Sequence, residues 1–235
     1  MATSSVDAPI LVVAALGREL ARLRSAMPSG VALLETGEGV LNAERNLETW
    51  LARGPARAVL SIGFAGALTG SLKAGDLVIA REVRDAPAKP DTSLLQAAES
   101  IGLTGSTPRF GLAVTSDEIL WQAESKRKLA NTLNPNEIGF VDTESTAIAG
   151  VCGRRGVPFL IVRSITDLLE EDLPLNFNLY RDSEGRVDSN RVLKATLLKP
   201  SAIAALLELR NRSELCAKRM AGFVRCLVPF IDRVY

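Results

Sequence analysis

The stretch FVDTESTAIAGVCGRRGVPFLIVRSITD, residues 140–167, decides the fold of this chain. It predicts an apolar helix that starts at Glu144 and ends in the glycine-containing break at 153–156, followed by a buried strand at 158–164. In open α/β sheets, ligands bind at the carboxyl ends of the strands. The strand runs directly towards Asp167, so two carboxylates are expected at one rim of the sheet, where chemistry would take place.

Each of these acids also has an ordinary structural explanation. Glu144 could be a first-turn acid that the helix dipole favours, and Asp167 could cap the element that follows it. For either acid alone, the structural explanation is the better one. A function has to rest on the other motifs of the chain.

Composition narrows the choice of chemistry. The 235 residues fit one α/β domain, and the 47% of hydrophobic residues are ample for its core. Lys and Arg (28) nearly balance Asp and Glu (27), which gives no electrostatic case for nucleic acid. Histidine is absent, so a carboxylate, a hydroxyl or water must supply any catalytic proton. The three cysteines lack metal-ligand spacing and indicate buried thiols in a reducing compartment.

The chain is expected to form one α/β domain at 9–235, with three layers around a central mixed sheet. Residues 1–8 are expected to be a loose leader, and 168–235 a variable helical extension. We find no signal peptide and no apolar run long enough to span a bilayer. The expected location is the cytoplasm.

Several strand-to-helix turns carry small residues or an acid. The apolar run ILVVAAL at 10–16 leads to Glu19 at the start of a helix, and a second short strand leads into the turn Thr36-Gly37-Glu38-Gly39. The buried strand at 58–67 contains Ser61-Ile62-Gly63-Phe64-Ala65-Gly66, and the strand at 77–80 follows a Gly-Asp corner. A glycine turn alone is weak evidence, because it can simply relieve backbone crowding.

Taken together, these motifs resemble the purine nucleoside phosphorylase and nucleosidase superfamily, especially the methylthioadenosine/S-adenosylhomocysteine nucleosidases. The matching runs are the Gly63 turn, the Leu-x-x-Gly-Asp entry at 72–76, Thr143-Glu144, and VPFLIVR followed by Ser164-Ile165-Thr166-Asp167. The resemblance covers the chain from about Ile10 to its end. It implies a nucleoside phosphorylase-like fold and an enzyme that cleaves N-glycosidic bonds.

The resemblance also implies roles for individual residues. Asp167 would be the general acid that protonates the purine N7, Glu144 would bind the ribose hydroxyls, and Glu19 would activate the attacking water. No metal and no cofactor are implied, although phosphate is a candidate co-substrate. The expected substrate contacts are Gly37, Gly63, Phe64, Ala65, Thr115, Ile119, Val141 and Thr143.

Departures from the family pattern keep other readings open. Thr143 replaces the family's Met, and Ile119 falls where its nucleosidases stack an aromatic on the purine, so a binding protein without turnover is one alternative. Phosphorolysis is another. Phosphorylases of the superfamily hold phosphate with an arginine where this chain has Ser61, and Arg18 and Arg45 are the only substitutes we considered. We therefore expect water to be the acceptor of the sugar.

The end of the chain resembles the hopanoid-associated branch of the superfamily, which implies an adenosyl lipid as a candidate substrate. We also expect a homodimer or a higher homo-oligomer. Residues 201–230 show apolar positions at helical spacing beside several arginines. This helix is expected to pack in the core or at a subunit interface. The alternative is peripheral contact of Phe223, Leu227, Val228 and Phe230 with anionic lipid.

Overall fold

The computed structural model describes residues 8–101, 107–182, 187–197 and 201–235. The predicted leader therefore lies outside the described residues, apart from Ala8. Seven strands form one mixed sheet: β1 (Ile10–Ala14), β2 (Val31–Glu35), β3 (Ala58–Ala67), β4 (Leu77–Val83), β5 (Arg109–Thr115), β6 (Gly139–Asp142) and β7 (Phe159–Asp167).

The sheet is built around β3 and β7. Strands β1, β2, β3 and β7 run parallel, and β4 pairs antiparallel with the middle of β7. From β4 the sheet continues through β5 to β6, and β6 returns to pair antiparallel with the end of β3. Every residue of β7 is buried, as expected for a strand covered on both faces.

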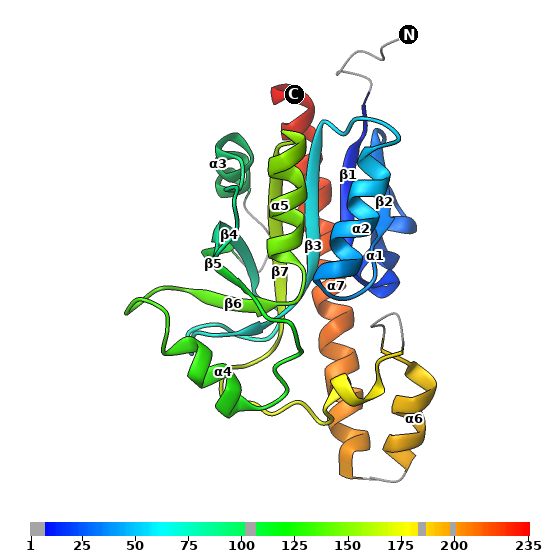
Figure 1. Cartoon of the computed structure of the whole chain (residues 1–235), viewed down its shortest axis with the longest axis vertical. Coiled ribbons are helices and arrows are strands. Elements are labelled where there is room, and N and C mark those ends of the chain that lie inside the picture. The colour runs from blue at the N-terminus through cyan, green and yellow to red at the C-terminus, as the bar shows by residue number, and fades with distance from the viewer. Residues whose placement is uncertain (1–7, 102–106, 183–186, 198–200) are drawn as a thin grey trace.

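Helices cover both faces of this sheet (Figure 1). One core cluster lies under α1 (Gly17–Arg24), α3 (Thr92–Ser100) and α7 (Ser201–Val234). The other lies under α2 (Val40–Leu51) and α5 (Ser145–Arg155). The remaining helices are α4 (Ala123–Ala130), the 3₁₀ helix η2 (Phe177–Tyr180) and α6 (Ser189–Leu197). The predicted three-layer arrangement with a central mixed sheet is confirmed.

Helix α7 corrects the lipid hypothesis. Phe223, Leu227 and Val228 are buried in the core beneath α1 and α3, and Phe230 packs against the same cluster. These residues pack in the core, as expected for this helix, and the alternative of lipid contact by the four side chains is contradicted, because they already cover the sheet. Over the part of the chain that the structure describes, no helix has the length and apolarity needed to cross a bilayer.

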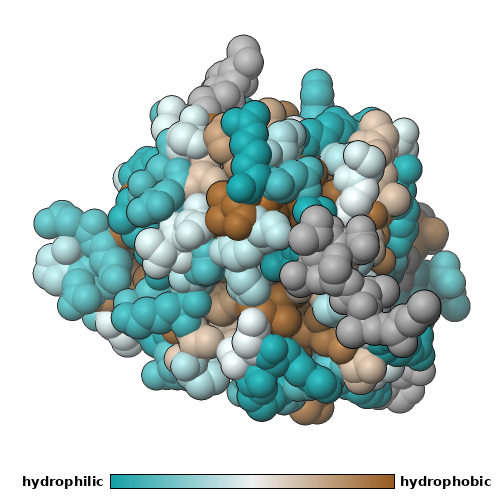
Figure 2. All heavy atoms as spheres, turned by 90° about the horizontal axis from the view of Figure 1, so that it is seen from above, coloured by the Kyte–Doolittle hydropathy of each residue, from teal (hydrophilic) through white to brown (hydrophobic). Residues whose placement is uncertain are grey.

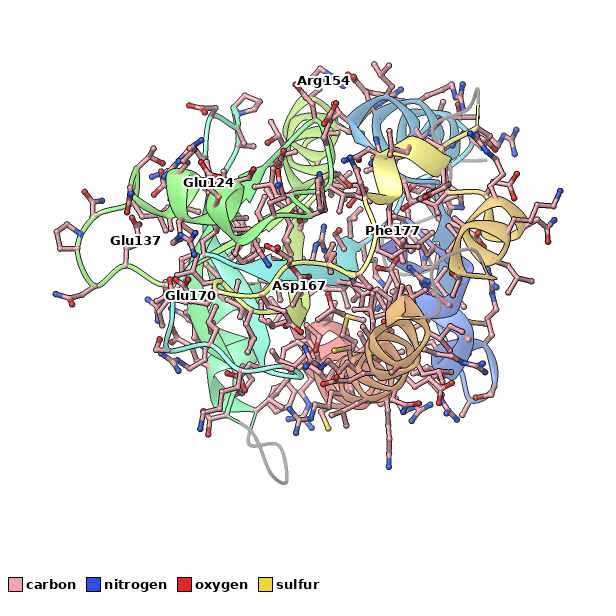
Figure 3. All side chains as sticks on the ribbon, turned by 90° about the horizontal axis from the view of Figure 1, so that it is seen from below. Glu124, Glu137, Arg154, Asp167, Glu170 and Phe177 are labelled. Atoms are coloured by element: carbon pink, nitrogen blue, oxygen red, sulfur yellow. The ribbon has the colours of Figure 1, made fainter. Side chains whose placement is uncertain are left out.

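The parallel strands end at the lower side of Figure 1, and Figure 3 is seen from that side. Asp167, at the end of β7, lies near the middle of this view with Phe177 to one side of it. The opposite end, shown in Figure 2, is covered mostly by hydrophilic residues with hydrophobic residues between them. The carboxyl ends of the strands thus bring the predicted acids to one end of the molecule.

Candidate active site

Glu19 is a buried carboxylate at the first turn of α1. Its Oε2 accepts a hydrogen bond from the backbone N–H of Leu16 at 2.8 Å, and its Oε1 accepts one from Phe64 at 2.9 Å. Burial raises the pKa of Glu19 to about 7, although these two hydrogen bonds favour the charged form. A carboxylate with this pKa is suited to act as a base near neutral pH.

Glu144 precedes α5 and reaches the Gly37–Gly39 turn. Its Oε1 accepts hydrogen bonds from the Gly39 backbone N–H at 2.9 Å and from the Thr143 hydroxyl. Gly37 and Gly39 both have positive φ, which favours glycine at these two positions. Burial, followed by the nearby charge of Asp142, raises the pKa of Glu144.

Asp167 ends β7 and forms a buried ion pair with a lysine from α4. Its Oδ2 lies 2.8 Å from Nζ of Lys126, and its Oδ1 accepts the Thr166 hydroxyl at 3.0 Å. Lys126 is fully buried and also donates to the carbonyl of Leu168. The charged composition of 123–133 indicates a surface helix, but Lys126 is buried, because its ammonium group pairs with a buried carboxylate.

Two glycines of β3 leave space for the carboxylates of Glu19 and Asp167. A Cβ atom at Gly63 would lie 3.2 Å from Oε1 of Glu19, and one at Gly66 would lie 2.9 Å from Oδ2 of Asp167. Three residues along a strand span about 10 Å. Strand β3 therefore places Glu19 and Asp167 at two points separated by roughly that distance.

A second buried ion pair joins the strands that carry this site. Nε of Arg163 lies 2.7 Å from Oδ2 of Asp142, and the same guanidinium donates to Ser61 and Ser145. Asp142 also accepts the Ser145 hydroxyl at the start of α5. This network ties β7, β6 and β3 together directly below Glu144.

Glu19 and Glu144 share a small cavity. Thr36, Ser61 and Arg163 also line it, and about 10 Å³ of it is open to the centre of a water molecule. This volume is close to the minimum that one water needs, and the walls are polar. The cavity can therefore hold a single water between the two carboxylates. Asp167 does not line it.

The other residues that were predicted to contact the substrate lie in different surroundings. Gly63 lies beside Glu19 and Thr143 donates to Glu144, whereas Gly37 faces Asn42 in the turn whose Gly39 N–H donates to Glu144. Phe64 uses its backbone N–H for Glu19, so this group is not free for a sugar, and Ala65 is buried next to it. Thr115 accepts from the Thr146 N–H and lines an open groove of about 500 Å³ between β5 and α4. Val141 packs in a small cluster with Leu68 and Val114.

Neither of the two candidate phosphate-binding arginines, Arg18 and Arg45, is among the residues that line the small cavity. Arg18 is exposed, with its guanidinium 5.6 Å from the centre of the Phe64 ring. Arg45 is also exposed and donates to Asn42. Ser61 is buried and hydrogen bonded to Arg163. The described residues that line the cavity thus include one arginine, Arg163, and Asp142 already neutralises it.

Residues 172–182 and 187–188 connect the two sides of the site, and we call them the strap. On one side, Leu173 donates to the Trp121 carbonyl at 2.7 Å, and the Asn178 side chain pairs with both backbone groups of Ile119 at 3.0 and 2.9 Å. On the other side, the Val187 N–H donates to Oε2 of Glu38 at 2.8 Å. Half-buried Phe177 lies on the strap.

Comparison with known proteins identifies the family of this site. A family model described as the phosphorylase superfamily matches residues 28–198. The 5'-methylthioadenosine/S-adenosylhomocysteine nucleosidase of Halalkalibacterium halodurans is 30% identical over 183 residues, which are 69% of this chain and 78% of that protein. The chain belongs to the phosphorylase superfamily.

Solved structures of this superfamily share the fold. The methylthioadenosine/S-adenosylhomocysteine nucleosidase of Neisseria meningitidis, in complex with methylthio-immucillin-A, has a TM-score of 0.70 at 21% identity and covers 94% of this chain and 98% of its own. The futalosine hydrolase of Helicobacter pylori has a TM-score of 0.66 at 18% identity, with the same coverage of both chains. At these identities, the likeness shows the fold.

Lys126, Arg163, Asp142 and the strap are parts of the candidate site that the sequence motifs did not predict. Arg163 interrupts a continuous apolar strand, which signals a buried partner. Lys126 stands three residues after Ala123, and both are buried on the same face of α4. The contact between Glu38 and Val187 joins residues 149 positions apart, and no local pattern predicts it.

The raised pKa of Glu19 predicts a pH-dependent cost to stability. In the unfolded chain this carboxyl ionises near its ordinary 4.5, and in the folded chain near 7. The folded state therefore binds more protons between these values, and stability falls as pH rises through this range, by about 3 kcal/mol in total. Below pH 4.5, both states are protonated and the cost is absent. In urea unfolding, the free energy of unfolding of Glu19→Gln should increase relative to that of the wild type as pH rises from 4.5 to 7. If the difference in unfolding free energy between the two proteins stays constant over this pH range, the claim that Glu19 is ionised while buried is contradicted.

Loss of Lys126 should destabilise the fold. Lys126→Met leaves the Asp167 carboxylate buried beside an apolar chain, which costs about 3 kcal/mol or more. The matched control is Lys128→Met, which removes an exposed ammonium that pairs with Glu124 one turn away on α4. This control should change the free energy of unfolding by at most about 0.5 kcal/mol. Equal effects of the two variants in urea unfolding would rule out a structural ion pair at Lys126.

Proposed function

We propose that this enzyme hydrolyses the N-glycosidic bond of an adenine-type nucleoside and releases the free base. The observation that carries this proposal is the pair of buried carboxylates, Glu19 and Glu144, on either side of a cavity that fits one water. The names of its nucleosidase and hydrolase relatives support the same reaction class.

Cleavage of this bond needs help at the sugar and at the base. As the C1′–N9 bond breaks, its electron pair goes to the purine and the sugar gains oxocarbenium character. In its protonated form, Asp167 would donate a proton to the purine N7, and the Lys126 ammonium, which lies 2.8 Å from Oδ2 of Asp167 in the ion pair of the free enzyme, would stabilise the carboxylate that this transfer leaves. Glu144, whose Oε2 accepts no hydrogen bond from the residues that the structure describes, would bind the ribose hydroxyls.

Glu19 would activate the nucleophile. A water in the small cavity gives its proton to Glu19 while its oxygen bonds to C1′, so the products are ribose and free base. The pKa of Glu19 near 7 leaves a useful fraction of the base ionised at neutral pH. Phosphate needs no such base. The exposure of Arg18 and Arg45 and the serine at position 61 further favour water as acceptor.

We propose Phe177 as the aromatic contact to the substrate in place of the family's aromatic near Ile119. Both backbone groups of Ile119 are held by Asn178, the neighbour of Phe177 on the strap. Phe177 is half-buried and lies on the same side of the molecule as Asp167 (Figure 3). An aromatic ring there can pack on a purine or on a substituent at the 5′ carbon.

A bulky apolar 5′ substituent, as on an adenosyl lipid of the hopanoid type, is the finer substrate that we propose. Leu179 on the strap and Leu193 on α6 are 64% and 60% exposed, and Leu207 on α7 is 55% exposed. These residues lie on elements at the lower end of Figure 1, beyond the ends of the strands. This proposal is tested with two adenosines, one that carries a hexylthio group at the 5′ position and one that carries a methylthio group there. A kcat/KM for the hexylthio compound below that for the methylthio compound would contradict it.

The reaction itself is tested by product analysis. Purified enzyme and methylthioadenosine are incubated in buffer with and without inorganic phosphate, and adenine and the sugar product are separated by chromatography. We expect adenine and the free sugar in both buffers. A sugar 1-phosphate formed only with phosphate would support phosphorolysis instead. Binding without cleavage would support a nucleoside-binding protein. Location in the cytoplasm and assembly into a homo-oligomer stay predictions.

A further inference from the structure

We propose that Thr143 makes the active site selective for one of the two ribose hydroxyls, because it commits one oxygen of Glu144 to the protein. Thr143 lies between the end of β6 and the start of α5, and its hydroxyl donates a hydrogen bond to Oε1 of Glu144. The Gly39 N–H donates to the same oxygen at 2.9 Å. Oε2 accepts no hydrogen bond within the part of the chain that the structure describes. The protein thus fills one oxygen of this carboxylate and leaves the other open.

The number of lone pairs decides what the Glu144 carboxylate can still accept. An ionised carboxylate has about four acceptor positions, two on each oxygen. The two protein donors occupy both positions of Oε1, which leaves the positions of Oε2 for a ligand. The Thr143 hydroxyl has a single hydrogen, which Glu144 already receives, so Thr143 cannot donate to the ligand as well.

The backbone holds both donors in place. Gly39 is the first residue before α2 and has a φ of 87°, which favours glycine. On the other side, the Glu144 and Ser145 N–H groups donate to Oδ1 of Asp142 at 3.3 and 3.1 Å. Thr143 lies within this hydrogen-bonded turn, and because it is β-branched, few rotamers are open to its hydroxyl. Oε1 is therefore held between two fixed donors.

The same two hydrogen bonds help to keep Glu144 charged. Burial, followed by the charge of Asp142, raises the pKa of this carboxyl, whereas the bonds from Gly39 and Thr143 favour its ionised form. An ionised carboxylate accepts a stronger hydrogen bond than a neutral acceptor does. When Glu144 is ionised, its open oxygen is therefore a strong acceptor for one donor of the substrate.

A ribose presents two hydroxyls, side by side on adjacent carbons. A carboxylate with both oxygens open can accept one hydroxyl on each oxygen. With only Oε2 of Glu144 open, both hydroxyls would have to meet one oxygen whose lone pairs diverge, so one hydroxyl aligns well and the other does not. This inference rests on the proposed function, in which Glu144 binds the sugar. It narrows the substrate class to nucleosides that keep one particular hydroxyl and can lack the other.

The experiment measures binding without any reaction. The ligands are three C-nucleosides of 9-deazaadenine, namely the riboside, the 2′-deoxyriboside and the 3′-deoxyriboside, in which a carbon–carbon bond joins base and sugar and is not hydrolysed. Calorimetry gives the Kd of each ligand for wild type, Thr143→Val and Thr143→Ser. Valine nearly keeps the shape of threonine but has no hydroxyl, whereas serine keeps the hydroxyl. The matched control is Thr49→Val, which removes an exposed hydroxyl on α2 that donates to the Arg45 carbonyl.

In the wild type, loss of one hydroxyl should weaken binding by about 10- to 100-fold, as for a charge-assisted hydrogen bond, and loss of the other by less than about threefold. Thr143→Val opens a position on Oε1, so each hydroxyl can meet its own oxygen. In this variant, loss of either hydroxyl should therefore weaken binding by about tenfold or more. Thr143→Ser and Thr49→Val should keep the pattern of the wild type.

A merely structural role for Thr143 predicts that Thr143→Val changes the Kd of all three ligands by the same factor, and this result would overturn the inference. Equal losses for the two deoxyribosides in the wild type, whether large or small, would overturn it as well. Release of adenine from methylthioadenosine in either case leaves the proposed function intact. A wild type that binds none of the three ligands also overturns the inference, and the product analysis then decides the proposed function by itself.

Discussion

Asp167→Asn should lower kcat for adenine release by about a hundredfold or more while the nucleoside still binds. Asparagine keeps the shape of the side chain but cannot give the purine N7 a proton, and general acid assistance contributes about 10²- to 10⁴-fold. Lys126 pairs with this carboxylate at 2.8 Å, so the variant also leaves a buried ammonium without its partner. Spectrophotometric assay of adenine release, with binding measured by calorimetry, separates the two effects.

Asp232→Asn is the control for this experiment. Asp232 is on α7 and pairs with Arg57, at the opposite end of the sheet from the carboxyl ends of the strands. It should keep wild-type turnover. Full activity of Asp167→Asn would remove Asp167 from the mechanism. Loss of nucleoside binding in that variant, with turnover per bound substrate unchanged, would indicate a role in binding alone.

Glu19→Gln should abolish hydrolysis, with a loss in kcat of about 10² or more. The amide cannot accept the proton of the attacking water. In the wild type, kcat/KM should rise with pH through about 7, because only the ionised carboxylate acts as a base and burial raises the pKa of Glu19 to about 7. A pH profile of adenine release for wild type and variant checks both statements.

The control here is Glu35→Gln, which removes an exposed carboxylate that pairs with Arg24. Its pH profile should follow the wild type. Residual activity of Glu19→Gln that shows the same rise near pH 7 would assign the base to another group, and Glu144 would then be the next candidate. Because Glu19→Gln is expected to be more stable than the wild type above pH 4.5, unfolding of the variant does not explain the loss.

Local patterns predicted much of this structure. The continuous apolar run before Asp167 predicted a strand buried on both faces, and every residue of β7 is buried. The acid at the start of the first helix was expected at a strand-to-helix turn, and Glu19 occupies that position in α1. Both predictions rest on periodicity and turn chemistry, which involve neighbours in sequence.

What the sequence did not predict depends on partners that are distant in the chain. Lys126 follows the acidic first turn of a short helix rich in charge, and only the ion pair with Asp167, 41 residues away, explains its burial. The apolar face of α7 was recognised, but its periodicity does not reveal whether lipid, a subunit or the sheet covers it. In the structure, the sheet covers it.

The strap is a third example. Its residues have the composition of a loop. Its role becomes clear only from the two sides of the site to which it is hydrogen bonded. Asn178 holds Ile119 on one side and Val187 binds Glu38 on the other. Tertiary contacts of this kind carry no local sequence signature.

The most direct test of the account is the fate of the oxygen that attacks the sugar. Methylthioadenosine is cleaved in phosphate-free buffer made with ¹⁸O-water, and the sugar product is analysed by mass spectrometry under conditions that limit exchange of its anomeric oxygen. We expect adenine and a sugar with one ¹⁸O atom, formed by the wild type and lost in Glu19→Gln. Absence of adenine until phosphate is added, with the sugar recovered as its 1-phosphate, would contradict water as the nucleophile.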